Sequence, residues 1–215
     1  TDAVIINSYL PRKAEIKLQF ALGQVPQLWR LCYSSFIDQS APNVELRDKI
    51  KFSYNKYDGF ERYVRWQLPQ IIPTCFLEGY KNLLRRTERL PFPAKPLFIF
   101  TSNNFDTDEI FKTWTAGQVE KGTPYFVGQH GNNYGTHKYY ANKHWPEQAT
   151  VDRFFTWGWK DVSRKYVPAF MLKGAEVKPK SYNPEGGVLL IEFPPPHRNA
   201  LNDNHHEYSL FQEEQ

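Results

Sequence analysis

Short apolar runs alternate with polar turns along the 215-residue chain, and the alternation is clearest between residues 97 and 127. The continuous apolar run 97–100 is typical of a fully buried parallel strand, and a second run of β-forming residues follows at 125–127. Between them, residues 106–109 supply an N-cap and an acidic first turn for a helix that ends at Gly122. The inner side of this helix is expected to carry Ile110, Phe111, Trp114 and Val119. The pattern predicts a β-α-β unit.

Outside this unit we expect short elements, namely strands at 3–6, 154–157 and 188–192, a helix at 13–22, and a short helix with a turn at 162–174. The region 60–89 has a mostly helical pattern with breaks at Pro69 and Pro73. Its second half presents a buried stripe formed by Leu77, Tyr80, Leu83 and Leu84. The run 29–36 fits a helix and a strand equally well.

Strands that alternate with helices indicate an α/β fold, for which we expect a Rossmann-like parallel sheet with flanking helices. A polar stretch begins at residue 177 and leads into the new apolar run at 188–192. Residues 1–176 are therefore predicted to form an N-terminal Rossmann-like domain. Residues 177–215 are predicted to form a linker and the start of a second, truncated Rossmann-like domain.

Two polar turns follow the strands of the β-α-β unit. A right-handed crossover would place residues 102–105 and 129–135 side by side at one edge of the sheet. Ligands of open α/β sheets bind there, beyond the carboxyl ends of the strands. His130 stands in the second turn between Gly128 and Gly131, and its imidazole titrates near neutrality, so it is the candidate general base. The alternative is a tight turn whose histidine only hydrogen-bonds a neighbouring loop.

The groups expected around His130 are neutral hydrogen-bonding groups: Ser102, Asn103, Gln129, Asn133, Tyr134 and the backbone amide of Gly131. Such groups bind hydroxyls and phosphates, which indicates a polyhydroxylated or phosphorylated ligand. His197, which follows the predicted strand at 188–192, is a further candidate for substrate binding.

Composition narrows the choice of partner. The net charge of +4 favours anionic small molecules or an acidic membrane surface over nucleic acid, and no basic run alternates with aromatic residues. The two cysteines, Cys32 and Cys75, do not form a CxxC motif, which favours a reducing, cytoplasmic compartment with two buried thiols. A single disulfide between them stays open as the alternative. No apolar stretch reaches the ~20 residues needed to span a bilayer.

Several motifs of known chemistry are missing from the sequence. It contains no GxGxxG or P-loop fingerprint, no HExxH motif and no GxSxG elbow. His137 and His144 would share a helical face but have no third ligand, so we expect no metal. No cofactor is expected either.

The segment Gly128-Gln-His-Gly-Asn-Asn-Tyr-Gly135 and the later Asp152-Arg-Phe-Phe-Thr-Trp-Gly-Trp159 resemble a family of bacterial transferases from surface-polysaccharide loci. The segments 8–11 and 17–26 also look like the start of that family, and the similarity extends to about residue 191. Members usually carry a glycine where this chain has Asn132. More distantly, the His-Gly turn is similar to one in the CDP-glycerol glycerophosphotransferases and the capsule Kdo transferases.

The resemblance implies one half of a GT-B architecture, in which this chain supplies the acceptor-side domain. It also implies a glycosyltransferase-like reaction, in which a nucleotide-activated sugar donor reacts with a glycan or lipid-linked acceptor. His130 maps onto the histidine that takes the acceptor proton. The implied location is the cytoplasm, with peripheral association at the inner face of the membrane as a further expectation. Two alternatives stay open: a catalytically inactive nucleotide- or glycan-binding module, and an interaction domain without a ligand site.

Overall fold

The computed structural model describes most of the first 178 residues and a few beyond them, namely 2–27, 39–50, 56–131, 134, 145–178, 181 and 183–187. The chain divides into two compact units, Thr1–Val177 and Lys178–Gln215, and every helix and strand given below belongs to the first. The run 29–36 and the predicted strand 188–192 lie outside the described residues.

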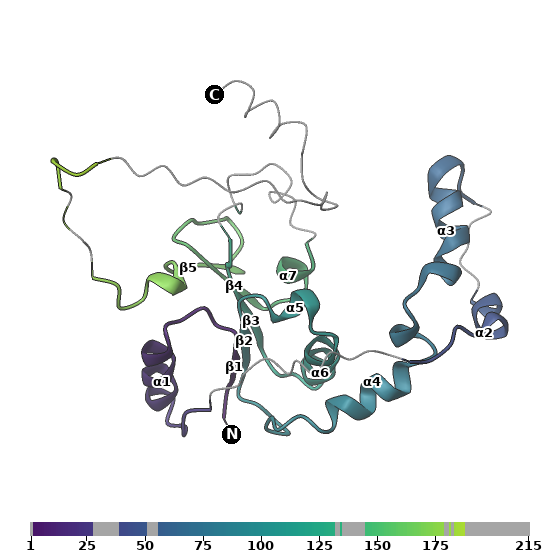
Figure 1. The fold of residues 1–215 in the computed structure, drawn as a ribbon, viewed down its shortest axis with the longest axis horizontal. Helices are drawn as coiled ribbons and strands as arrows, with labels where there is room; N and C mark the ends of the chain where they lie inside the picture. Colours follow the sequence, from purple (N-terminus) through teal and green to yellow (C-terminus); the bar gives the residue numbers. More distant parts are fainter. Residues whose placement is uncertain are drawn as a thin grey trace. The chain divides into compact units, whose positions relative to one another are not determined.

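The centre of the first unit is a sheet of five parallel strands in the order β1-β2-β3-β4-β5 (Figure 1). Its strands are β1 (Val4–Ile6), β2 (Ile99–Thr101), β3 (Tyr125–Gly128), β4 (Arg153–Thr156) and β5 (Tyr166–Pro168). Every neighbouring pair is parallel, with Ile99 opposite both Val4 and Tyr125. The predicted α/β fold with a Rossmann-like parallel sheet is confirmed.

The helix predicted at 162–174 is wrong. This segment forms β5 and then a short 3-10 helix, η3 (Leu172–Gly174). Backbone pairing with β4 and burial of the Tyr166 ring, which is 6% exposed, stabilise the strand. Tertiary packing therefore outweighs the local helical pattern.

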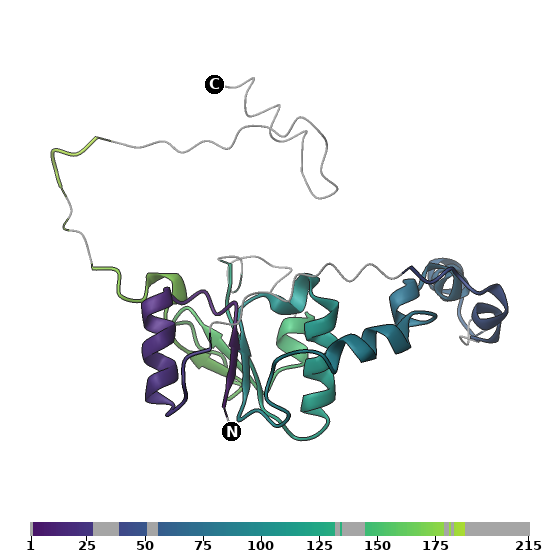
Figure 2. The ribbon, with the colours of Figure 1, turned by 60° about the horizontal axis from the view of Figure 1, so that its bottom comes forward.

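Helices flank the sheet on both sides. Figures 1 and 2 show α1 (Arg12–Ala21) on one side and α5 (Asn104–Thr107), α6 (Glu109–Val119) and α7 (Pro146–Ala149) on the other. Asp108 caps α6 as predicted, because its carboxylate accepts a hydrogen bond of 2.9 Å from the amide of Phe111. The expected inner position of Val119 is wrong, since this residue is 36% exposed at the end of the helix.

Among the described residues between α1 and β2, the helical segments are α2 (Val44–Lys49), α3 (Gly59–Ile71), η1 (Thr74–Phe76) and α4 (Tyr80–Thr87). The predicted break at Pro69 is wrong, because Pro69 lies inside the last turn of α3. Arg47 stabilises this turn by donating to the backbone carbonyls of Pro69, Gln70 and Ile72 at 2.9–3.1 Å. The Arg47 guanidinium also pairs with Glu78, whose pKa its hydrogen bonds lower to about 2.

The stripe predicted along the second half of this region is only partly buried. Leu83 is fully buried, whereas Tyr80 and Leu84 are 44% and 38% exposed. Helix α4 packs against α6 and buries Leu83, whereas the other side of the predicted stripe stays exposed. The last turn of α4 carries the basic residues Arg85 and Arg86.

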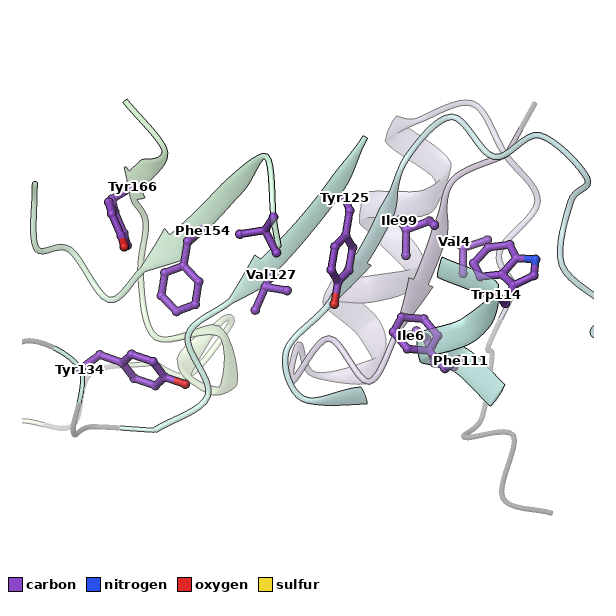
Figure 3. Packing of buried hydrophobic residues seen from close by; sticks show 11 residues of the cluster. Val4, Ile6, Ile99, Phe111, Trp114, Tyr125, Val127, Tyr134, Phe154 and Tyr166 are labelled. Carbon is purple, nitrogen blue, oxygen red and sulfur yellow. The ribbon is translucent and has the colours of Figure 1, made fainter. Parts of the chain in front are cut away.

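The core lies between the sheet and the layer of α6. Figure 3 shows Phe111 and Trp114 of α6 near Val4 and Ile6, and at the other end a group of rings from β4, β5 and the turn after β3. In that group, Phe154 is fully buried, with ring centroids 5.3 Å from Tyr134 and 5.9 Å from Tyr166. The core therefore supports the turn that carries His130.

Candidate functional site

The carboxyl ends of β1, β2 and β3 lie at one edge of the sheet. Each is followed directly by polar residues, which include Asn7 after β1, Asn103 after β2 and His130 after β3. The rings of Phe105 and His130 meet edge to face with centroids 5.7 Å apart. The predicted juxtaposition of the turns after β2 and β3 is confirmed by this contact.

His130 is half-buried and hydrogen-bonds a tyrosine, which in turn hydrogen-bonds a carboxylate. Its Nδ1 lies 3.1 Å from the Tyr134 hydroxyl, and that hydroxyl donates to Glu147 Oε1 at 3.0 Å. A tyrosine hydroxyl carries one hydrogen, and here it is directed to Glu147. Nδ1 of the neutral ring therefore donates to the hydroxyl oxygen, and Nε2 keeps its lone pair. This tautomer is the one that a general base acting through Nε2 requires.

The pKa of His130 is lowered from its ordinary value near 6.5. Burial is the largest cause, because it penalises the charged imidazolium, and the positive charge of Lys173 acts in the same direction. The negative charges of Glu147 and Asp106 oppose this shift without cancelling it. The ring is thus mainly neutral at pH 7, in the form that accepts a proton.

Replacing two of the three charges that act on His130, Glu147 and Lys173, should move its pKa in opposite directions. Glu147→Gln removes a negative charge that favours the imidazolium, so the His130 pKa should fall further. Lys173→Met removes a positive charge that disfavours it, so the pKa should rise toward the ordinary value. NMR titration of the His130 ring measures both shifts, with Lys160→Met as a control that leaves the pKa unchanged. Shifts of the same sign in the first two variants would contradict the electrostatic account.

Gln129 holds the turn after β3 to the turn after β4. Its side chain is 2% exposed, and its Nε2 donates to the Gly131 carbonyl at 2.7 Å. Its Oε1 accepts from the Trp157 amide at 3.0 Å and from the Trp159 indole at 2.8 Å. These bonds occupy the polar atoms of the side chain that the sequence assigned to substrate. In the structure Gln129 positions the loop that carries His130.

The groups after β1 and β2 form a hydrogen-bonded cluster. Asn103 hydrogen-bonds Asn7 and donates from its Nδ2 to the Tyr9 hydroxyl at 2.6 Å. Asn7 and Tyr9 have left-handed backbone angles, with φ of 47° and 62°. The ammonium of Lys173 lies 4.3 Å above the Tyr9 ring. Lys173 and Tyr9 join the site although sequence analysis did not single them out.

Ser102 is fully buried and its hydroxyl donates to the Ser8 carbonyl at 2.9 Å. This bond joins the segment after β2 to the segment after β1. Tyr134 is 4% exposed and contacts His130, whereas Gly131 is half-buried at the start of the turn. Asn133 and His197 lie outside the described residues. Glu147, the carboxylate next to Tyr134, was missed because its separation of 17 residues from His130 follows no known motif.

Gly128→Ala is expected to lower the free energy of unfolding by about 1–3 kcal/mol. A Cβ at this position would lie 2.7 Å from Leu172 Cδ1 and 3.0 Å from Phe100 Cζ and Ser102 Oγ. The Ser102 hydroxyl cannot withdraw without losing its bond to the backbone. Gly131→Ala is the matched control, since nothing lies within 4 Å of a Cβ there. Chemical denaturation measures both variants, and equal stabilities would contradict the predicted crowding at Gly128.

Within the described ranges, no three side chains of His, Cys, Asp or Glu come together as a metal site would require. In the same ranges, no helix has the length and apolar character of a membrane span.

The model of a protein family described as LIC12162 family transferase matches residues 1–214. No curated protein and no solved structure matches the chain significantly.

Proposed function

Because the chain belongs to the LIC12162 family of transferases, we propose that it catalyses the transfer of an activated sugar or related group from a nucleotide donor to a surface-polysaccharide acceptor. The observation that carries the proposal is the chain of hydrogen bonds from His130 through Tyr134 to Glu147. It leaves Nε2 of a neutral imidazole available at the carboxyl edge of a parallel sheet, where ligands of such folds bind.

The proposed reaction is a direct displacement. Nε2 of His130 takes the proton of an acceptor hydroxyl while the acceptor oxygen forms a bond to the activated carbon or phosphorus of the donor. The bond from that atom to the nucleotide oxygen breaks, and the nucleotide leaves with the bonding electrons. The Glu147 carboxylate stabilises the imidazolium through the Tyr134 hydroxyl.

The remaining groups of the edge have separate roles in the proposal. Asn103 and the Gly131 amide orient oxygens of the acceptor or the donor, and Lys173 attracts the anionic donor. Gln129 and Ser102 act through the backbone that they hold. The architecture would be GT-B, with a second Rossmann-like domain that binds most of the nucleotide.

The proposal is tested by incubating the protein with a panel of sugar nucleotides and CDP-glycerol, together with glycan and lipid-linked acceptors. Release of the free nucleotide that depends on the acceptor supports it. Calorimetry on the same panel identifies the alternative, because donor binding without any turnover would indicate a catalytically inactive binding module.

A further inference from the structure

Helix α3 has a large exposed apolar surface. None of its 13 residues is buried, although it carries four large apolar residues that are more than half exposed. The exposed fractions are 80% for Phe60, 56% for Tyr63, 56% for Trp66 and 62% for Ile71. Within the part of the chain that the structure describes, no other helix of the first unit exposes a comparable group of aromatic residues. Exposed large apolar side chains that are grouped on one helix mark an interaction surface.

The apolar residues of α3 share one face of the helix. At 100° per residue, Phe60 and Ile71 lie within about 20° of each other, with Tyr63 and Trp66 following on one flank. Arg65 lies on the opposite side, where it pairs with Glu61 and stacks 3.9 Å above the Tyr57 ring. Arg62 lies about 40° beyond Trp66, at the edge of the apolar face. A helix with aromatic residues on one face and arginines at the edge of that face and behind it has the form of helices that lie in a membrane interface.

The segment that contains α3 and α4 has an excess of positive charge, which favours an acidic partner. Between Lys56 and Arg89 the sequence holds seven lysines and arginines and four acidic residues, a net charge of +3, of which α3 itself carries +1 through Arg62, Arg65 and Glu61. A hollow of about 370 Å³ is lined by Gly59, Arg62, Tyr63 and Trp66, which places a guanidinium beside two aromatic rings. Tryptophan and tyrosine side chains with an arginine nearby typically contact lipid headgroups at the edge of the acyl region.

We propose that α3 binds the surface of anionic lipid bilayers, with its aromatic face in the interface and Arg62 and Arg65 at the level of the phosphates. This binding is independent of the chemistry assigned to His130. It would hold the site beside a membrane, where a lipid-linked acceptor is found.

Flotation of the full chain with vesicles tests the proposal. Vesicles of phosphatidylcholine mixed with phosphatidylglycerol should retain the protein, and pure phosphatidylcholine vesicles or high salt should release most of it. Replacing both Tyr63 and Trp66 with serine should weaken partitioning at least about tenfold, since two interfacial rings are lost. Arg62→Glu should lower binding to the anionic vesicles only.

Matched controls separate the aromatic face from general hydrophobicity. Val162→Ser and Phe170→Ser replace apolar residues that are 100% and 54% exposed outside α3, and both variants should bind as wild type does. All substituted residues are exposed, so circular dichroism should show an unchanged fold. Equal retention of wild type and the Tyr63 and Trp66 double variant would overturn the proposal.

A second measurement locates the contact. Brominated lipids should quench tryptophan emission in the wild-type chain, and Trp66→Phe should lose the largest share of that quenching while it still binds. Sedimentation of the lipid-free protein tests the alternative that a second copy of the chain binds the apolar face of α3. A dimer that the same double substitution dissolves, without binding of anionic vesicles, would assign α3 to a second copy and overturn the proposal.

Discussion

Replacing His130 with alanine is expected to lower kcat/KM for group transfer by about a hundred- to ten-thousandfold, the range that a general base supplies. The substitution removes Nε2, which the bond between Nδ1 and the Tyr134 hydroxyl leaves unprotonated in the neutral ring. Initial rates across a range of pH measure the effect. In the wild-type protein the rate should decrease as the pH drops below the pKa of His130, because the base becomes protonated there, and this pKa is lower than the ordinary value of about 6.5. This acidic limb of the pH profile should vanish in the variant.

Tyr134→Phe is the companion variant, because it keeps the ring that packs on Phe154 and removes only the hydroxyl. Its loss of rate should be smaller than that of His130→Ala, since the base remains but is less well oriented. If His130→Ala kept activity within a few-fold of wild type, or kept the acidic limb, another group would have to be the base.

Replacing Phe154 with alanine is expected to lower the free energy of unfolding by about 3–5 kcal/mol. The ring is fully buried and packs against Tyr134, Trp159 and Tyr166 with centroid distances of 5.3–6.4 Å. Few side chains can move to fill the space, because three of its neighbours are themselves large rings. Chemical denaturation with the midpoint and slope fitted together gives the difference.

The matched control is Phe170→Ala, which removes a ring that is 54% exposed and should change stability by less than about 0.5 kcal/mol. Phe154→Ala should also reduce activity by more than unfolding explains, since the ring supports Tyr134. A stability loss similar to that of the control would mean that the core at β4 rearranges freely, contrary to the packing described.

The sequence predicted the elements whose pattern is local and strong. The apolar runs at β1, β2 and β3 and the capped helix α6 lie within about a residue or two of their predicted positions. The predicted meeting of the turns at His130 and Phe105 followed from the right-handed crossover alone. These features depend on short-range periodicity and on chirality, which a single sequence carries.

Other features depend on tertiary contacts that no local pattern encodes. β5 forms because β4 offers a free edge to the segment around Tyr166, whose own pattern favoured a helix. Pro69 stays helical because Arg47, 22 residues away in the sequence, binds the carbonyls at the end of α3. The polarity of Gln129 suggested ligand contact, whereas its amide hydrogen-bonds the neighbouring turn. Polarity alone cannot distinguish these two uses.

The bonds that Gln129 makes across two turns have a consequence for the energetics of ligand capture. Its main-chain carbonyl accepts from the Trp157 indole at 3.0 Å, and its side chain holds Trp159 as well, so residues 129–131 and 157–159 form one cross-linked frame. A molecule that reaches this frame meets a backbone that is already ordered. Association there sacrifices little conformational entropy of the protein, so even a small ligand with few contacts can be retained.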